Sequence, residues 1–534
     1  MAAHYLWLPC PAPNHDILVV DESVLDKATE MASFEPSRSA EDHKRAGAGG
    51  LEEAMERRRV ALLVRDAITK HRGRELAYLR QRGVEIDDIR ACMKHLATRD
   101  EARPDVDGKM TDDEIAARLD AVEAREILKV LMLFRQIGRG FDQPRDRLNS
   151  VCFDPEARVK VGKEIERAER VFVGHLREPR IARATPVLVL DGTGSIALNR
   201  KLFGERMNEH RFAAPRDAEV TQVKHKAFSR QSLTGCDHRG NPISHKKMKE
   251  AQRLRDQVVE LLRLLPGNVL LVTYKAVEDL LVNLLPPHVS IAHFGALRGL
   301  NAFEHYETVV VLGREQPSAQ AIEALTRPFT ATDPEPFIPI EEYALQSRGR
   351  RMRNGGPNVV EVHVHSDPRC QAMLEQVREA EIAQAIDRVR PVFNRRRIIL
   401  LTNLPLDVTV DQTMPWKDLR PARFAIAYAR HGALPLSASE VARCFPDLWQ
   451  SQNAAKLDTK RVGLNGVKAQ IRTLFGERPH LISDPIKAVY RRSGQRGRPT
   501  RVLVSPELAD PRQAVREGSR EGHRVPPREA ATST

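Results

Sequence analysis

The sequence predicts an α/β protein built from several domains. Short runs of branched apolar residues end directly in carboxylate or glycine-rich turns, which is typical of buried parallel strands. Patterns of helical period lie between these runs, and strands that alternate with helices favour parallel sheets. The chain has 534 residues, a length that corresponds to roughly three to four domains.

The composition favours an anionic partner. Hydrophobic residues make up 41% of the chain, which is enough for real cores, and aromatic residues only 5%, so packing relies on aliphatic side chains. The formal net charge is +13 and the pI is about 9.6. Nucleic acid is therefore the first partner to expect.

The cysteines and the apolar runs predict a cytoplasmic protein without a membrane span. No Cys-x-x-Cys occurs, which argues against a disulfide framework or a cysteine-rich zinc site. No apolar run approaches the ~20 residues that a span needs. Residues 1–13 contain prolines and no basic segment, unlike a signal peptide. The cysteines are widely spread, at positions 10, 92, 152, 236, 370 and 444.

The first apolar run, residues 17–20, leads into Asp21 and Glu22. We expect a parallel strand covered on both faces, with the two carboxylates at its carboxyl end, where ligands gather in open α/β sheets. An aspartate there can hold Mg²⁺ on nucleotide phosphates, and the glutamate can orient the attacking water. The alternative is a strand that ends in acidic turn residues.

A charged helical region follows from about residue 51 to 178. Thr111 and Glu114 fit a capping box, and apolar residues recur at helical spacing up to Phe134. Residues 51–95 and 155–176 also read as helical. We interpret the charged runs as solvated faces without chemistry.

A second buried strand is expected at residues 186–190. It ends in the glycine-rich turn 191–195, where backbone can approach a ligand closely, although a plain β-turn explains the same residues. Cys236, His238 and His245 have poor metal-ligand spacing and no fourth ligand, so we expect a polar loop there.

A second parallel sheet is expected between residues 201 and 405. Its strands are residues 268–274, 308–314 and 398–401, and the last of these closes the sheet. His363 and His365 alternate along a further strand, as cross-strand residues do. Residues 348–353 form a basic flexible loop that suits phosphate contact or a solvent-facing linker. Residues 379–391 read as a helix in which Gln384 and Arg388 share a face.

The C-terminal part reads as a small helical domain with a basic hairpin. Ser437 and Glu440 fit a capping box that opens a helix at residues 439–445, and more helix follows to about residue 474. Residues 487–492 and 500–504 read as two strands around a glycine-rich turn. The tail after residue 511 is polar, a composition typical of disorder.

Taken in order, these stretches resemble the motifs of superfamily 2 helicases, in the arch-containing branch related to nucleotide-excision-repair helicases. The resemblance covers about residues 1–405. Residues 20–23 match the Walker B motif, residues 190–194 resemble motif III, residues 269–274 motif IV, residues 298–301 motif V and residues 384–390 motif VI. The helical region lies where that branch carries its arch.

The resemblance implies two RecA-like lobes with ATP and Mg²⁺ as cofactors and DNA as partner. Asp21 would hold the magnesium ion and Glu22 the water, while Arg388 and Arg390 would neutralise charge on the transferred phosphoryl group. The remaining motif residues would bind nucleotide, couple the lobes or, for Arg298, contact DNA. The coupling residues are Asp191, Thr193, Gly299, Asn301 and Gln384.

Two departures from the family pattern stand out. Asp387 occupies a position where the family usually has glycine. No Gly-x-x-x-x-Gly-Lys-Ser/Thr occurs in the sequence, so the Walker A loop that cradles phosphates is missing. This favours a start site set too far downstream or a truncated gene, with a first lobe that lacks its opening strands.

The C-terminal domain resembles a winged helix, with one helix for the major groove and a wing for the backbone. The wing would contact DNA through Arg491, Arg492, Arg496 and Arg498. A small capping domain with a solvated basic hairpin is the alternative.

The predicted organisation is an α/β protein with RecA-like lobes, a helical insertion and a winged helix. We expect an ATP-dependent DNA helicase or translocase that is inactive as this chain, or alternatively a non-enzymatic DNA-binding protein derived from a degenerate helicase. The segments are a partial first lobe (1–50), the insertion (51–178), a return strand of the first lobe (179–200), the second lobe (201–405), a linker (406–432), the winged helix (433–510) and a tail (511–534).

Overall fold

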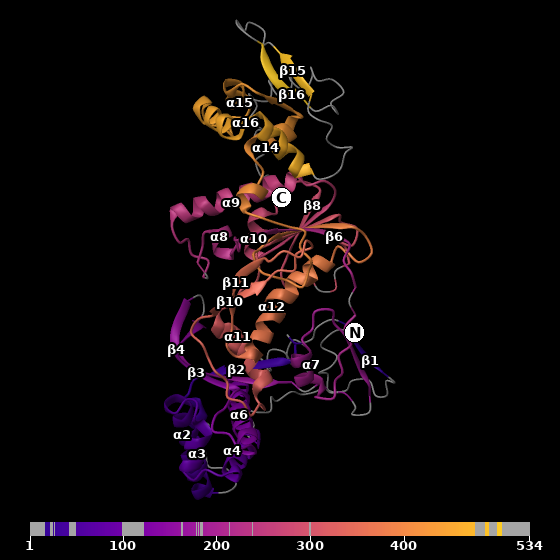
Figure 1. The fold of residues 1–534 in the computed structure, drawn as a ribbon. Coiled ribbons are helices and arrows are strands. Elements are labelled where there is room, and N and C mark those ends of the chain that lie inside the picture. The colour runs from indigo at the N-terminus through magenta and orange to yellow at the C-terminus, as the bar shows by residue number, and fades with distance from the viewer. Residues whose placement is uncertain are drawn as a thin grey trace, which may run out of the picture. The chain divides into compact units, whose positions relative to one another are not determined.

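A computed structural model shows a mixed α/β chain divided into two compact units (Figure 1). Unit 1 comprises residues 1–212, 316–346 and 361–380, and unit 2 comprises residues 213–315, 347–360 and 381–534. The predicted second lobe, residues 201–405, is therefore shared between the units. The structure describes residues 17–21, 25, 27–41, 50–98, 122–161, 164–177, 179, 181, 185–212, 214–237, 239–297, 299, 301–475, 486–490 and 499–504.

Unit 1 contains a parallel pair of strands, β1 (Leu18–Asp21) and β5 (Val187–Leu190). The two predicted strands are confirmed, but the prediction that the first is covered on both faces is wrong. Leu18 and Val20 are buried in a core with α7 (Ile196–Phe203), whereas Val19 on the opposite face is 41% exposed. Burial therefore alternates along β1, because the described core packs on only one face of this pair.

A second part of unit 1 packs helices against an antiparallel sheet of order β2-β4-β3. The strands are β2 (Thr29–Phe34), β3 (Val151–Val161) and β4 (Glu164–Leu176), and the helices are α1 (Arg38–Glu41), α2 (Gly50–Lys70), α3 (Glu75–Gln81), α4 (Ile86–Thr98) and α6 (Val122–Phe141). The helical prediction for residues 51–95 and for the end of the 111–134 pattern is confirmed. Thr111 of the proposed capping box lies outside the described residues.

The helical prediction for residues 155–176 is wrong, because they belong to β3 and β4. The charged residues of this stretch are good helix formers, but its apolar residues face a core that only the folded chain supplies. Val171 and Val173 are buried, and β4 pairs with β2 more than a hundred residues earlier in the chain. Tertiary pairing therefore overrides local propensity here.

The remaining elements of unit 1 are α11 (Ala319–Thr326), the 3₁₀ helix η3 (Arg327–Thr330) and the first part of α12 (Pro368–Asp387). The hairpin strands β10 (Ala344–Gly349) and β11 (Val359–Val364) and helix α12 carry residues of both units. Helix α12 begins earlier than predicted and ends at Asp387, so Arg388 and Arg390 follow the helix rather than lying on it.

Unit 2 is centred on a parallel sheet of six strands in the order β13-β6-β12-β9-β7-β8. All residues of β7 and β9 are buried, which is typical of central strands covered on both faces. The strand at residues 398–401 lies between β6 and β9 rather than closing the sheet. The strands are β6 (Ala218–Val223), β7 (Val269–Thr273), β8 (Val289–His293), β9 (Thr308–Leu312), β12 (Arg396–Leu401) and β13 (Gln412–Met414), and the helices are α8 (Arg230–Thr234), α9 (His245–Leu264), α10 (Lys275–Leu281) and α13 (Trp416–Leu419).

The C-terminal part of unit 2 has its own core and a sheet of order β14-β16-β15. The predicted linker at residues 406–432 is wrong, because it contains β13 and a helix, α14, whose Phe424 and Tyr428 belong to this core. Ser437 caps α15 without a side-chain hydrogen bond, so the predicted capping box does not form. The elements are α14 (Arg423–His431), β14 (Ala433–Pro435), α15 (Ala438–Cys444), α16 (Gln452–Phe475), β15 (Ile486–Tyr490) and β16 (Thr500–Val504).

No helix in the described parts of the chain is long and apolar enough to cross a membrane.

Candidate functional site

In unit 1, two predicted carboxylates lie at the carboxyl ends of neighbouring strands. Asp21 ends β1 and is paired in register with Leu190, and Asp191 follows directly on β5. The Asp191 Oδ1 atom accepts hydrogen bonds from the Thr193 backbone N (2.9 Å) and from Thr193 Oγ1 (3.1 Å). The register thus brings Asp21, Asp191 and Thr193 to one edge of the strand pair. Glu22 lies outside the described residues.

The turn after β5 is tightly packed. The Asp191 Oδ2 atom is buried and has no hydrogen-bond partner among the described residues, and a Cβ atom at Gly194 would lie 2.7 Å from it. Only glycine fits at this position without a shift of the carboxylate. Carboxylate oxygens are the ligands that Mg²⁺ prefers, and the ion usually takes one or two of them together with water. Asp21 and Asp191 could hold such an ion. Among the described residues, no group of three or more His, Cys, Asp or Glu is arranged to do so.

Gln376 reaches this turn from α12, a contact that no local sequence pattern predicts. Its side-chain Oε1 accepts a hydrogen bond of 3.0 Å from the backbone N of Ser195, the residue that precedes α7. Gln376 is 181 positions later in the chain, so only the fold relates the two. The interaction fixes the end of the turn that starts at Asp191.

In unit 2, two further predicted segments meet. The Arg390 Nη2 atom donates to Asn301 Oδ1 at 3.3 Å, and its Nε atom lies 3.2 Å from Glu304 Oε2. Arg390 is exposed and its backbone has a φ of 47°, which residues other than glycine rarely adopt. Gly299 has a φ of 71° with no atom near its position for a Cβ, so it is needed for conformation rather than space. Arg298 lies outside the described residues.

Gln384 and Arg388 lie at the end of α12. Gln384 is buried, Arg388 is half-buried, and the backbone N of Arg388 donates to the carbonyl of Gln384 at 3.2 Å. Asp387, at the position where the resemblance leads one to expect glycine, forms a bidentate ion pair with Arg216. Hydrogen bonding with Asp387 raises the pKa of Arg216.

These residues lie at the amino ends of the strands. Arg390 precedes β12, Asn301 precedes β9, and the backbone N of Asp217, just before β6, donates to Pro391. Ligands of open α/β sheets usually bind at the opposite, carboxyl ends. The exposed Arg390 guanidinium therefore lies beside the Asn301 amide at the amino edge of the sheet. This placement suits contact with an anion that is bound outside this sheet.

The carboxyl edge of the sheet is closed where a ligand is most often found. After β7 the chain continues to β8, and after β9 it continues in the opposite direction to β12, so β7 and β9 flank a topological switch point. Tyr274 fills this position, and its hydroxyl donates to the Arg314 carbonyl (2.7 Å) and accepts from the Arg314 N (3.0 Å). Burial raises the pKa of Tyr274 to about 12.

Two carboxylates lie beside this edge. Burial raises the pKa of Glu315, the charge of Arg230 opposes the shift, and the carboxylate of Glu381 adds to it. Glu381 accepts a hydrogen bond of 2.9 Å from the Gly295 backbone N. No local sequence pattern predicts this pair, because its members come from segments on either side of β10 and β11.

The basic loop at residues 348–353 is largely structural. Arg350 is buried and donates to the carbonyls of Lys224 (3.0 Å) and Asn403 (2.7 Å), and burial lowers its pKa. Arg351 lies 3.0 Å from Asp407, and Arg353 pairs with Asp411. The interpretation as a flexible phosphate-contacting loop is therefore wrong for Arg350, and Arg351 and Arg353 are paired with carboxylates. The fourth arginine, Arg348, lies on β10.

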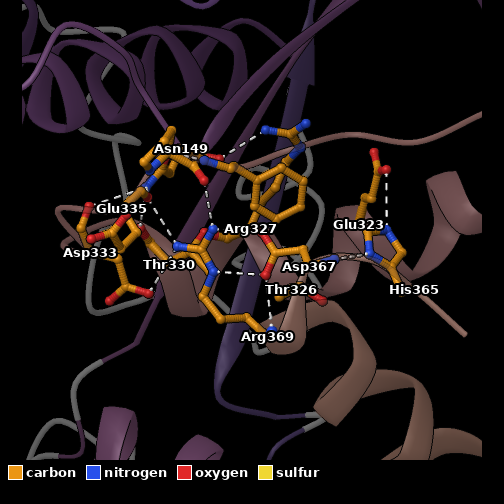
Figure 2. A network of polar contacts seen from close by, with 12 residues as sticks. Asn149, Glu323, Thr326, Arg327, Thr330, Asp333, Glu335, His365, Asp367 and Arg369 are labelled. Atoms are coloured by element: carbon orange, nitrogen blue, oxygen red, sulfur yellow. Dashed lines mark hydrogen bonds and ion pairs between the residues drawn. The ribbon is translucent and has the colours of Figure 1, made fainter.

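Figure 2 shows a buried polar network in unit 1 that the sequence did not reveal. The Asn149 Nδ2 atom donates to the carbonyls of Thr330, Asp333 and Glu335, and Arg327 Nη1 donates to the Asn149 carbonyl at 2.9 Å. These interactions tie the segment after η3 to the start of β3. This part of the network is structural, because Asn149 and Arg327 use these side-chain donors on backbone carbonyls.

A histidine of this network has a defined tautomer. His365 Nδ1 accepts from the Asp367 backbone N at 3.0 Å, which leaves the proton on Nε2, 3.4 Å from Glu323 Oε1. His363 lies on β11, as predicted, whereas His365 follows the strand and is buried. Neither histidine has a described role in binding.

The predicted wing arginines Arg491, Arg492, Arg496 and Arg498 lie outside the described residues, as does His238 of the rejected metal set. The strands on either side of the wing are described, and Lys487 and Arg501 on them are exposed. Comparisons with protein-family models, curated proteins and solved structures found no match to this chain.

Proposed function

We propose that this chain belongs to an ATP-driven DNA helicase or translocase of superfamily 2 type, with two RecA-like lobes and a C-terminal winged helix. One observation carries the proposal. Arg390 contacts Asn301 across 89 positions of sequence, which joins the two segments that the resemblance assigns to motifs V and VI. The parallel order of the unit 2 sheet and the placement of Asp21 beside Asp191 agree with it.

The chemistry would be phosphoryl transfer, which depends mainly on positioning and charge stabilisation. Asp21 would hold Mg²⁺ on the nucleotide and Glu22 would orient the water. Arg388 and Arg390 would neutralise charge that develops on the phosphoryl group, with Gln384, Thr193 and Asp191 in contact with the nucleotide or its water. Asn301 would orient Arg390.

The sequence lacks a Walker A loop, and this predicts the result of the first test. Residues 1–534 should hydrolyse ATP at background rates with or without DNA. Robust DNA-stimulated turnover that is lost in Glu22→Gln would show that the phosphate-binding role is filled by other residues.

The second test addresses the arginines. In a protein to which a Walker A segment has been joined before Met1, Arg388→Ala should lower kcat by roughly 10³-fold or more and change KM little, because an arginine finger acts in the transition state. Arg397→Ala, on β12 and away from motif VI, is the matched control. An unchanged kcat in Arg388→Ala would contradict the assignment.

The second candidate function is a non-enzymatic DNA-binding protein, and the C-terminal part of unit 2 favours it. Its elements follow the order α14-β14-α15-α16-β15-β16, with helices on a three-stranded antiparallel sheet. This order supports the winged-helix assignment and does not depend on ATP. A stop codon directly upstream of Met1, in place of an in-frame Walker A segment, would favour this candidate.

A further inference from the structure

The amino-terminal half of α9 carries an exposed group of cations that the proposed function does not use. We call it the α9 basic surface. Helix α9 follows a small hairpin in which Cys236 and Pro242 form an antiparallel β-bridge of the backbone. Arg239 lies in the turn of that hairpin. All of its members are exposed, and they are Arg239, Lys246, Lys247, Lys249 and Arg253.

The surface is held by ordered structure. Ser244 caps α9, and its hydroxyl accepts from the Lys247 backbone N at 3.2 Å. The hairpin packs closely on the helix, because a Cβ atom at Gly235 would lie 2.8 Å from Met248 Cα. The opposite side of α9 is buried through Ala251, Leu254 and Val258, so the cations occupy the solvent side of a packed helix.

Folding of the helix does not explain these cations. The amino-terminal end of a helix carries partial positive charge, so lysines there are unfavourable and carboxylates favourable. The first turn of α9 has no acidic residue, and Lys246, Lys247 and Lys249 lie within its first five positions. Carboxylates at these positions would stabilise the helix more than lysines do.

Between Lys246 and Arg253 the helix carries a single acid, Glu250, which does not neutralise the surface. Glu250 forms an ion pair of 3.1 Å with Lys247. Its pKa is lowered first by that hydrogen bond and further by the charges of Lys246 and Arg253, which shows that several cations surround one carboxylate. The α9 basic surface therefore has a net positive charge.

We infer that the α9 basic surface binds the phosphate backbone of nucleic acid, and this inference rests on the proposed function. Lys246, Lys249 and Arg253 lie at i, i+3 and i+7 and therefore share one face. Seven residues of helix span about 10 Å, and over that length of duplex axis one strand carries roughly three phosphates, at a rise of about 3.4 Å per nucleotide. Contacts of this kind position the nucleic acid and carry no sequence information.

An anionic membrane is the other polymer-like surface that lysines attract. Helices that bind membranes insert an apolar face into the lipid boundary. The apolar face of α9 is buried inside unit 2 and is not available for insertion. The geometry therefore favours nucleic acid.

The test uses residues 1–534 carrying Lys246→Gln, Lys249→Gln and Arg253→Gln together. The control carries Lys70→Gln, Arg90→Gln and Lys94→Gln, which remove the same charge from exposed positions of α2 and α4. Binding of labelled single-stranded and duplex DNA of unrelated sequence is followed by fluorescence anisotropy from about 50 to 200 mM KCl. Circular dichroism verifies that both variants are folded.

The α9 variant should bind roughly tenfold or more weakly on every sequence, and its log–log salt slope should fall by about two to three. The control should stay close to wild type. Equal binding by the α9 variant, or an equal loss in the control, would overturn the inference and leave the proposed function standing. Absence of DNA binding by wild type would overturn both. Loss of binding to phosphatidylserine vesicles, with DNA binding unchanged, would reassign the surface to membranes.

Discussion

Arg216 and Asp387 form a bidentate ion pair at the end of α12, with Nε–Oδ1 at 2.7 Å and Nη2–Oδ2 at 2.8 Å. A carboxylate at the carboxyl end of a helix is disfavoured by the helix dipole, and the guanidinium offsets that cost. The pair also fixes the start of the segment that carries Arg388 and Arg390. Asp387 thus has a structural role at the position where the family pattern has glycine.

Replacement of Asp387 by glycine should lower the free energy of unfolding by about 1–2 kcal/mol, from loss of a partly exposed ion pair and added backbone freedom. A double-mutant cycle with Arg216→Ala, measured by denaturant unfolding, should give a coupling of about 0.5–1 kcal/mol. Arg397→Ala combined with Asp387→Gly serves as the uncoupled pair. Additive effects of Arg216 and Asp387 would mean that the pair does not hold this segment.

Gly313 should be the least replaceable glycine at the carboxyl edge of the unit 2 sheet. A Cβ atom there would lie 2.5 Å from Tyr274 Cε2 and 2.7 Å from the Phe228 carbonyl, and its φ is 90°. Gly313→Ala should cost about 2–5 kcal/mol, from overpacking of about 1–3 and an unfavourable φ of about 1–2. Gly355 has a φ of 68° and open space where a Cβ would lie, so Gly355→Ala should cost only the ~1–2 kcal/mol of the unfavourable φ. Equal losses in thermal or denaturant unfolding would show that Tyr274 does not close the switch point.

Asp367 should stabilise unit 1 in a pH-dependent manner. Burial acts to raise its pKa, but hydrogen bonds from the Arg369 side chain and backbone outweigh burial and leave the pKa below its ordinary value. A lowered folded-state pKa contributes stability that is present above the unfolded value of about 3.9 and is lost as pH falls through the folded value. Asp367→Asn should therefore cost about 1–3 kcal/mol near neutral pH.

The difference between wild type and Asp367→Asn should stay constant down to about pH 4–5 and shrink only below that. Urea unfolding across this range measures it. Asp142→Asn, at an exposed carboxylate, is the control and should change little at any pH. A gap that instead closes between about pH 7 and 5 would contradict the direction of the pKa shift.

Three central strands of the unit 2 sheet, β7, β9 and β12, could be predicted because each is a continuous apolar run, whereas β6, β8 and β13 were not predicted. Residues 269–273 and 308–312 are buried at every position, and such runs read as central parallel strands from sequence alone. The stretch at 155–176 was misread because its charged residues favour helix locally, while its pairing with β2 is a long-range property. A local pattern predicts an element well when the burial of that element can be inferred from its own residues, without knowledge of a distant partner.

The candidate site was predictable only in part for the same reason. Asp21 and Asp191 are recognisable from their place at the ends of strands, and Asn301 only from the resemblance to motif V. Gln376, which holds the turn near Asp191, and Tyr274, which closes the switch point, act through partners set by the fold. The Asn149–Arg327 network joins positions 178 apart, and a single sequence carries no signal for such a pairing.

The C-terminal part of unit 2 should bind duplex DNA only when α14 is included. Phe424 and Tyr428 of α14 belong to the same core as Trp449 and Leu503, so a fragment of residues 430–510 lacks part of its core. Residues 420–510 should fold and bind DNA, whereas residues 430–510 should be unfolded by circular dichroism. Equal folding of the two fragments would contradict the assignment of α14 to this domain.

Helix α16 and the wing should contribute separately to that binding. Lys456 and Lys460 are exposed on the outer side of α16, while Asp458 faces inward and accepts from Trp449 Nε1 at 2.9 Å. Lys456→Gln should weaken binding of residues 420–510 and lower the log–log salt slope by about one, and Arg496→Ala with Arg498→Ala should lower it by about two on unrelated sequences. Arg443→Gln is the matched control, because Arg443 already pairs with Glu440 at 2.9 Å. Fluorescence anisotropy at several salt concentrations measures the slopes. Binding that ignores salt, or that survives all these changes, would leave the hairpin and α16 as solvated surfaces and remove the DNA-binding role of this domain.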